Sequence, residues 1–334
     1  ENSSLTKSIY SIDIKGKNKK LLSKPNGIND ADFSKTFKYF INTYSNANNP
    51  NYITLQNNQG KLIRVLKDSK KLLDILNEYN LSTKEFFSFK TEYNVMLNGW
   101  MMRPQNFDKN KKYPVLMYVY GGPGNQQVVD SWSSHYMWYQ LLCQNDFIIV
   151  CIDNRGTGGR GAEFKKCTYQ ELGKLETEDQ ISAAKYLSSL EYVDKNRIGI
   201  WGWSYGGYMS SLCLLKGHEY FNTAIAVAPV TNWRFYDTIY TERYMRTPQE
   251  NPDGYDLNSP INYVDLLKGN YLLIHGSADD NVHYQNTMEM ISALVQSNKQ
   301  FELFIYPDKN HSIYGGNTRI HLFTKITNFI IQNL

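Results

Sequence analysis

The clearest signal in the sequence is the stretch 197–207, which reads RIGIWGWSYGG. Its apolar start, Arg197–Trp201, predicts a buried strand, and the residues from Tyr205 to Lys216 predict a helix. Between them, Gly202-Trp203-Ser204-Tyr205-Gly206 fits the pattern G-x-S-x-G, in which a serine occupies a sharp, strained turn and the glycines leave room for neighbouring backbone. The helix N-terminus beneath Ser204 favours developing negative charge. We therefore interpret Ser204 as a nucleophile rather than an idle serine in a glycine-rich turn.

Outward from this motif, apolar strands alternate with helical stretches. The expected strands are Phe86–Thr91, Asn94–Met102, Val115–Tyr120, Phe147–Ile152, Arg197–Gly202, Thr223–Ala228, Tyr271–His275 and Phe301–Tyr306. The expected helices are Lys70–Asn77, His135–Cys143, Glu176–Leu190, Tyr205–Lys216, Tyr284–Ser297 and Arg319–Gln332. The apolar strands are expected to be buried on both faces. Such alternation predicts an α/β unit with a mostly parallel, doubly wound sheet over residues 68–334.

Residues 1–67 have a different pattern, with short strands joined by turns. Strands are expected at Ile9–Ile14, Lys19–Leu22, Ala31–Phe33, Tyr39–Thr43, Asn51–Leu55 and Lys61–Leu66. Four antiparallel strands make a unit the size of a propeller blade, and about one and a half such units fit here. They cannot close a ring alone, so exposed edges are expected. The first residue is Glu1 and not Met, so we expect this chain to be part of a longer protein whose N-terminal part is missing from the sequence.

Two further loops supply an acid and a base in the order that such a serine requires. Asp279 and Asp280 follow the strand at 271–275, and His311 follows the strand at 301–306. Strands of a parallel sheet end at one edge, so both loops are expected beside Ser204. His311 would take the serine proton and one aspartate would hold the imidazole tautomer. Spacing alone does not separate the two aspartates. No catalytic role is expected for the other histidines, His135, His218, His275, His283 and His321.

An oxyanion formed at Ser204 would need two hydrogen-bond donors. The backbone N–H of Tyr205 is one, and the phenol of Tyr120 at the end of an earlier strand is the second candidate, with a packed aromatic as the alternative. Aromatic residues also gather at 233–244, where Tyr236, Tyr240 and Tyr244 have the spacing of one helix face. That face is either core or the wall of a flat apolar pocket that suits a proline ring.

Composition excludes several classes of protein. With 41% hydrophobic residues the chain can bury a core, yet it has no apolar run of the about 20 residues that a membrane-spanning helix needs. The net charge is only +4 and the basic residues are scattered along the chain, so no nucleic-acid partner is expected. Four cysteines without a C-x-x-C pair argue against a disulfide scaffold and a cysteine zinc site. The proposed chemistry needs no cofactor and no metal.

Several motifs together resemble the dipeptidyl peptidase IV branch of the prolyl oligopeptidase family. They are GWSYGGY at 202–208, AVAPV at 226–230, YTERYM at 240–245 and LIHGSADDNVH at 273–283. The segments 31–34 and 39–45 resemble the last blade of that family's propeller. The resemblance implies an α/β-hydrolase fold preceded by a partial β-propeller remnant.

The resemblance also implies a role for individual residues. Ser204 matches the nucleophile, His311 the base, Asp279 the orienting acid and Tyr120 the tyrosine that completes the oxyanion hole. Asn281 matches an asparagine that binds a substrate carbonyl. The residues that match the walls of the proline-accepting pocket are Tyr205, Val230, Trp233, Tyr236, Tyr240 and Val282.

The implied activity is that of a serine peptidase that releases N-terminal dipeptides after proline or alanine, through an acyl-enzyme. The acidic pair that binds the substrate's amino group lies on the family's propeller and has no counterpart in residues 1–67. A prolyl oligopeptidase or acyl-aminoacyl peptidase therefore stays open as an alternative. A catalytically dead binding relative is disfavoured, because Ser204, Asp279 and His311 are all present.

The expected partners are peptides with proline at the second position. By resemblance, a homodimer would form through the helices near 284–298 and 319–332. The resemblance also places the protein outside the cytoplasm, in a bacterial periplasm.

Overall fold

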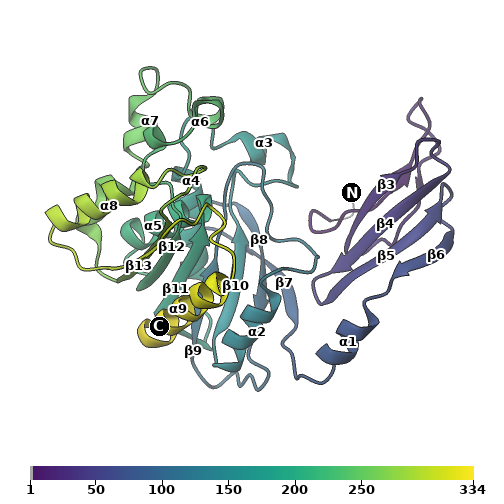
Figure 1. The fold of residues 1–334 in the computed structure, drawn as a ribbon, viewed down its shortest axis with the longest axis horizontal. Helices are drawn as coiled ribbons and strands as arrows, with labels where there is room; N and C mark the ends of the chain where they lie inside the picture. The colour runs from purple at the N-terminus through teal and green to yellow at the C-terminus, as the bar shows by residue number, and fades with distance from the viewer. Residues whose placement is uncertain (1–2) are drawn as a thin grey trace.

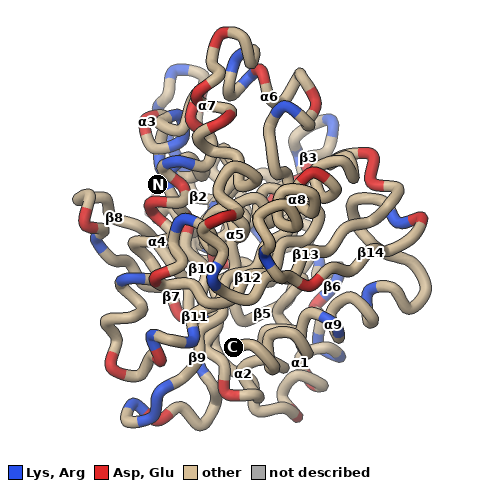
Figure 2. The backbone as a smooth tube through the Cα atoms, turned by 90° about the vertical axis from the view of Figure 1, so that its left-hand side faces the viewer, with Lys and Arg blue, Asp and Glu red and all other residues tan. Residues whose placement is uncertain are grey.

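The computed structural model describes residues 3–334, which form two large sheets of different kinds and a small two-stranded sheet (Figure 1). An eight-stranded sheet lies in the α/β unit, and a four-stranded antiparallel sheet lies in the N-terminal unit, residues 3–67. The short helix α1 (Lys70–Leu76) connects the two units. Basic and acidic residues are intermixed along the backbone (Figure 2).

The eight-stranded sheet has the order β14-β13-β12-β11-β9-β10-β8-β7. Neighbouring strands are parallel except for the β7–β8 and β8–β10 pairs, which are antiparallel. The strands are β7 (Lys84–Lys90), β8 (Met96–Met102), β9 (Tyr113–Tyr118), β10 (Ile148–Asp153), β11 (Val193–Trp203), β12 (Thr223–Val227), β13 (Asn270–Gly276) and β14 (Glu302–Tyr306). The predicted mostly parallel, doubly wound sheet is confirmed, and the arrangement is that of an α/β-hydrolase fold.

Helices cover both faces of this sheet because its strands are apolar on both sides. The helices α4 (Lys174–Ser188), α5 (Tyr205–Lys216) and α8 (Gln285–Gln296) share one core cluster with strand residues such as Val115 and Met117. The helices α2 (Tyr136–Gln144) and α9 (Thr318–Asn333) share the other cluster with alternate residues such as Leu116 and Trp201. The alternation of successive strand residues between two cores fixes the register of the sheet.

The four-stranded sheet runs up and down in the order β3-β4-β5-β6, as predicted for a propeller blade. Its strands are β3 (Ile28–Phe33), β4 (Tyr39–Asn46), β5 (Asn49–Asn57) and β6 (Leu62–Lys67). Every residue of the edge strand β6 is exposed. The strand expected at 9–14 shrinks to β1 (Tyr10–Ser11), which pairs with β2 (Lys20–Leu21), because Ile12 and Ile14 point into solvent.

Hydrogen bonds join the two units, and two of them share the carboxylate of Asp130. Asp130 of the α/β unit accepts from the backbone N–H groups of Gly27 at 2.9 Å and Ala47 at 2.8 Å. The backbone N–H of Lys84 donates to the side chain of Asn48 at 2.8 Å. Gly27 has a φ of +70° and its position leaves 2.3 Å between an added Cβ and the Ser45 carbonyl, so glycine is required there. The N-terminal unit is thereby held by its turns.

The segment between β12 and β13 differs most from the sequence prediction. It contains a 3₁₀ turn at Trp233–Phe235, α6 (Thr238–Met245), α7 (Pro252–Asp256) and a second 3₁₀ segment at Pro260–Leu266. The other helix missing from the prediction is α3 (Gly161–Lys166). Tyr236 precedes α6, so the helix face inferred from Tyr236, Tyr240 and Tyr244 is only partly helical. Strand β14 was expected to be buried but is an edge strand whose first two residues are exposed.

Candidate active site

Ser204 occupies a tight turn between β11 and α5, as the motif predicts. Its φ of 61° and ψ of −120° are strained for a non-glycine residue, at a cost of about 1–3 kcal/mol. A backbone hydrogen bond stabilises the strained turn: the Ser204 N–H donates to the Val227 carbonyl at 2.8 Å. A Cβ at Gly206 would come within 2.2 Å of the Val119 carbonyl, so the following helix can approach the sheet only with glycine there. The serine side chain is thus presented at the carboxyl edge of the sheet.

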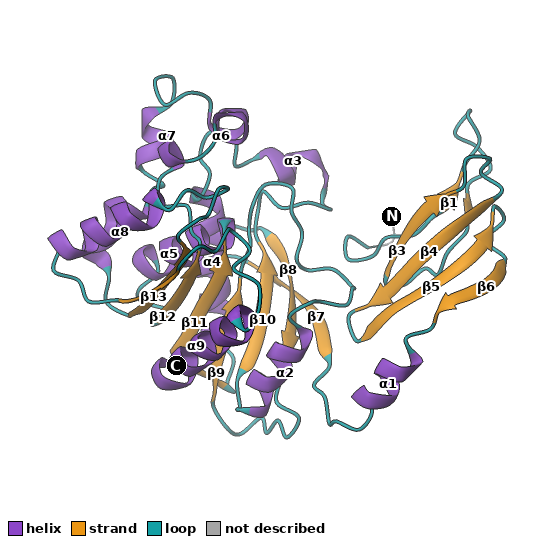
Figure 3. Cartoon of the chain, in the orientation of Figure 1, coloured by secondary structure: helices purple, strands orange, loops and turns teal. Residues whose placement is uncertain are grey.

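Asp279 and His311 meet at the same edge, because Asp279 follows β13 and His311 follows the neighbouring strand β14. Figure 3 shows β11, β12 and β13 side by side in this sheet. The His311 Nδ1 lies 2.7 Å from the Asp279 Oδ2, and the Asp279 side chain is fully buried. The neighbouring Asp280 is exposed, so geometry separates the two aspartates that spacing left open. The other oxygen of Asp279 accepts from the backbone N–H groups of Asn281 at 3.0 Å and Val282 at 2.9 Å.

The carboxyl group of Asp279 is held as an anion. Burial alone would raise its pKa, but the hydrogen bonds from His275 and His311 outweigh burial. The pKa therefore lies well below its ordinary value, and the group can orient an imidazole and stabilise an imidazolium.

The loop that carries His311 is tied to the serine turn. The Trp203 indole N–H donates to the His311 carbonyl at 2.9 Å, and Trp203 directly precedes Ser204. Within residues 3–334 the Ser204 hydroxyl has no hydrogen-bond partner, which is common for a catalytic hydroxyl before substrate binds. The predicted serine, histidine and aspartate therefore lie on three loops at one edge of the sheet, which follow β11, β14 and β13.

Both residues expected to supply oxyanion donors border the serine turn: Tyr205 follows Ser204, and an added Cβ at Gly206 would lie 3.2 Å from the Tyr120 Cα. Tyr205 is the first residue of α5, so its backbone N–H has no acceptor within the helix. The half-buried ring of Tyr120 lies 6.0 Å from the ring of Tyr205. Burial raises the pKa of the Tyr120 phenol, which keeps it protonated and able to donate.

The aromatic residues predicted to form a pocket pack against one another beside these donors. Trp233 lies 5.4 Å from Tyr205, 5.7 Å from Tyr236 and 5.8 Å from Tyr240, measured between ring centroids. Val230 and Val282 are buried in the same cluster. The Tyr236 hydroxyl donates to the Asn281 Oδ1 at 2.7 Å, which leaves the Asn281 amide hydrogens free to donate elsewhere.

Three more residues belong to this region: the sequence left Tyr244 as core or pocket wall, and it assigned no site role to His275 and Glu176. Tyr244 extends the aromatic cluster, 4.8 Å from Tyr240. His275 is fully buried and contacts Asp279. Glu176 is fully buried and accepts from the Tyr205 hydroxyl at 2.8 Å.

Glu176 is the most unusual of the three, because burial raises its pKa to about 8. Its second oxygen accepts from the Gly173 N–H at 3.0 Å, which completes the first turn of α4. Spacing carried a signal: Glu176 shares the buried face of α4 with Gln180, Ala183 and Leu187.

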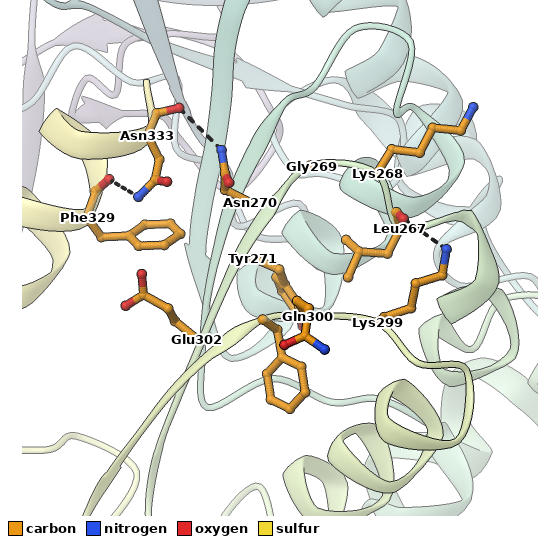
Figure 4. A pocket seen from close by; sticks show the side chains of 11 residues that line it. Leu267, Lys268, Gly269, Asn270, Tyr271, Lys299, Gln300, Glu302, Phe329 and Asn333 are labelled. Carbon is orange, nitrogen blue, oxygen red and sulfur yellow. Dashed lines mark hydrogen bonds between the residues drawn. The ribbon is translucent and has the colours of Figure 1, made fainter.

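A cavity beside β13 is not part of this region. It measures about 400 Å³ and is lined by residues 267–271, residues 299–302 and α9 (Figure 4). Asn270 begins β13, whereas Asp279 follows its other end, and seven strand residues span roughly 20 Å. The cavity therefore lies at the opposite edge of the sheet.

No helix in residues 3–334 has the length and apolar character needed to cross a membrane.

Known proteins match both units. The model of the prolyl oligopeptidase family matches residues 132–334, and the model of the dipeptidyl peptidase IV N-terminal region matches residues 1–51. A probable dipeptidyl-aminopeptidase B of Podospora anserina is 39% identical over 340 residues, which cover 99% of this chain and 36% of that protein.

Two solved structures share the fold. The crystal structure of Porphyromonas gingivalis dipeptidyl peptidase 4 has a TM-score of 0.97 and 49% identity, and the match covers 100% of this chain and 47% of that one. A putative dipeptidyl aminopeptidase IV from Bacteroides ovatus has a TM-score of 0.85 and 31% identity, with 98% and 54% covered. The chain thus spans about a third of the length of the fungal relative and about half of each solved chain.

Proposed function

Because the chain belongs to the dipeptidyl peptidase IV branch of the prolyl oligopeptidase family, we propose that the protein that carries it is a serine dipeptidyl peptidase. It releases dipeptides from the N-termini of peptides with proline or alanine at the second position. The observation that carries this proposal is the 2.7 Å contact between His311 and Asp279, on loops adjacent to the Ser204 turn.

The reaction is an acyl transfer through Ser204. As the Ser204 oxygen attacks the carbonyl carbon of the substrate proline, the His311 Nε2 takes the hydroxyl proton, and Asp279 stabilises the imidazolium. The Tyr205 N–H and the Tyr120 O–H donate to the oxyanion. Collapse of the tetrahedral intermediate breaks the peptide bond, and His311 returns its proton to the leaving amine. Water, activated by His311, then hydrolyses the acyl-enzyme.

Substrate selection follows from the aromatic cluster. The rings of Tyr205, Trp233 and Tyr240 pack together as an apolar cluster, and burial of a pyrrolidine ring against it contributes roughly 1–2 kcal/mol at about 25 cal/mol per Å². Asn281, held by Tyr236, donates to a substrate carbonyl. The family resemblance places the carboxylates that bind the free amine on the propeller.

By the same resemblance we propose a homodimer in a periplasmic location. The helices α8 and α9 present exposed apolar side chains, among them Val295 and Ile320, that suit a contact between copies.

A panel of Gly-Xaa fluorogenic amides tests the proposed activity. We expect hydrolysis of Gly-Pro and Gly-Ala amides to exceed that of Gly-Leu, labelling of the protein by a fluorophosphonate, and loss of both in Ser204→Ala. Equal hydrolysis of all three amides would contradict the pocket assignment. Labelling that persists in Ser204→Ala would contradict the choice of nucleophile.

A further inference from the structure

A second histidine contacts the carboxylate that orients His311. His275, near the end of β13, is fully buried, and its Nε2 lies 3.1 Å from the Asp279 Oδ2 and 2.9 Å from the Val282 carbonyl. The same Asp279 oxygen lies 2.7 Å from the His311 Nδ1. One oxygen of the acid is therefore shared by two imidazoles.

The hydrogen bonds of His275 define its tautomer. Both groups beside Nε2 are acceptors, so Nε2 must carry a hydrogen. The Nδ1 lies 2.7 Å from the hydroxyl of Thr287, a fully buried residue in the first turn of α8. A threonine hydroxyl can donate to an unprotonated Nδ1, which leaves His275 neutral. Neutrality suits the reaction, since a second buried cation would oppose protonation of His311.

We propose that His275 is a positioning residue of the triad: its Nε2–H holds the Asp279 carboxylate in the orientation that His311 requires, and the Thr287 hydroxyl fixes the tautomer that makes this possible. The inference rests on the proposed serine peptidase mechanism. It extends the hydrogen-bonded chain from His311 through Asp279 and His275 to Thr287 of α8.

The carboxylate of Asp279 is fixed from both sides in this arrangement. The backbone N–H groups of Asn281 and Val282 hold Oδ1, while His275 and His311 hold Oδ2. Loss of the His275 donor frees the carboxylate to rotate, which slows proton transfer. It also removes a donor that shares the charge of the carboxylate, so the Asp279 anion stabilises the His311 imidazolium more strongly.

The phenols of Tyr284 and Tyr236 also face this pair. The Tyr284 ring packs 5.6 Å from the His275 ring, and the Tyr236 phenol lies near Asp279. Burial raises the pKa of Tyr236 to about 12, so it does not titrate with His311. The acid limb of the pH profile of kcat/KM therefore reports His311.

Three variants test the proposal in the longest natural chain that contains residues 1–334. His275→Leu removes all three hydrogen bonds of the ring, Thr287→Val removes the hydroxyl at nearly constant shape, and His275→Gln keeps a side-chain donor. The matched control is His218→Gln, because His218 contacts the Leu215 carbonyl and Lys268 instead of Asp279.

For His275→Leu we expect kcat to fall about tenfold to a hundredfold with little change in KM, and the acid limb to move up by about half a pH unit or more. Thr287→Val is expected to lower kcat about threefold to tenfold, with a smaller shift in the same direction. His275→Gln should recover most of the activity, and His218→Gln should match the wild type.

A wild-type kcat and acid limb in Thr287→Val and His275→Leu would overturn the inference, and so would a change confined to KM. If His275→Leu does not fold, as judged by thermal unfolding, Thr287→Val decides the question. A wild type that hydrolyses p-nitrophenyl acetate but not Gly-Pro amide would contradict the proposed specificity, and the ester then serves for the same comparison. A wild type with no Ser204-dependent reaction would overturn both proposals.

Discussion

At the scale of single residues, the pairing of Asp279 with His311 is the basis of the proposed chemistry. Asp279 accepts four hydrogen bonds, two at each oxygen, which leaves its carboxylate with one orientation. The adjacent Asp280 has the same chemical group but is exposed. The two residues therefore make a matched pair for mutagenesis.

We expect Asp279→Asn to lower kcat about a thousandfold or more, because the amide hydrogens would face the His311 Nδ1 and select the wrong tautomer. Asp280→Asn should retain wild-type activity. Steady-state hydrolysis of Gly-Pro amide measures both. Comparable losses in the two variants would contradict the assignment of Asp279.

A second residue-scale prediction concerns Glu176 and pH. Its pKa is raised from 4.5 to about 8, so between these values the native state holds a proton that the unfolded state has released. The unfolded state then binds fewer protons, and the free energy of unfolding falls as pH rises, by up to about 1.4 kcal/mol per pH unit. Glu176→Gln does not titrate, so its stability relative to the wild type should increase from pH 5 to pH 8.

Urea unfolding of both proteins at pH 5, 6.5 and 8 measures this difference. The slope with pH is the test, because the amide also changes the hydrogen bonds to Tyr205 and Gly173. A stability difference that is constant with pH would show that Glu176 titrates normally.

At the scale of elements, the sequence predicted the regular core well. Helix α5 matches its predicted bounds, Tyr205–Lys216, because glycines mark its start and the apolar strand before it is unambiguous. Most other predicted elements lie within a few residues of the observed ones. The reason is physical: buried strands and amphipathic helices leave a periodic signal in the chain.

Elements that owe their conformation to tertiary contacts were missed. Helix α6 is eight residues long, and its N-cap, Asp237, accepts from the Tyr240 N–H only once the Trp233 turn is in place. Strand β14 is apolar enough to suggest burial, but its position at the sheet edge leaves Leu303 exposed. His275 and Glu176 look like ordinary core or cap residues in sequence, since only the folded chain brings them to Asp279 and Tyr205.

The element-scale prediction concerns the helix that follows Ser204. Gly206→Ala should destabilise the fold by about 1–3 kcal/mol and remove most activity, because the new Cβ would press on the Val119 carbonyl and shift the serine turn. Gly16→Ala is the control: Gly16 has a φ of +74° but open space around its Cβ position. That variant should lose about 1 kcal/mol and keep full activity.

Chemical unfolding and hydrolysis assays are made on both variants. Gly206→Ala measures the effect of the clash with the Val119 carbonyl, and Gly16→Ala measures the effect of backbone strain without a clash. Full activity in Gly206→Ala would contradict this prediction, because it would mean that the serine turn tolerates a displaced helix.

At the scale of the whole molecule, two units meet at Asp130. Its carboxylate satisfies the Gly27 and Ala47 N–H groups, so the N-terminal unit is docked by its turns and leaves β6 exposed at the far edge. The triad residues lie in the α/β unit alone. Docking and chemistry should therefore respond to different substitutions.

We expect Asp130→Ala to weaken docking by about 2 kcal/mol or more, because it leaves two N–H groups without an acceptor. Limited proteolysis and amide hydrogen exchange over residues 27–47 should quicken, while hydrolysis of p-nitrophenyl acetate stays unchanged. Asp146→Ala, which removes an exposed ion pair with Lys111, should do neither. Unchanged exchange in Asp130→Ala would contradict the proposed docking contact.

The proposed function requires that Ser204, His311 and Asp279 act in a peptidase that removes dipeptides after proline. The most direct test compares hydrolysis of a Gly-Pro fluorogenic amide with and without an N-terminal blocking group, in the longest natural chain that contains residues 1–334, with Ser204→Ala as the control. We predict that only the substrate with the free amine is cleaved and that the control is inactive. Equal or faster cleavage of the blocked substrate would contradict the dipeptidyl peptidase and favour an oligopeptidase on the same fold.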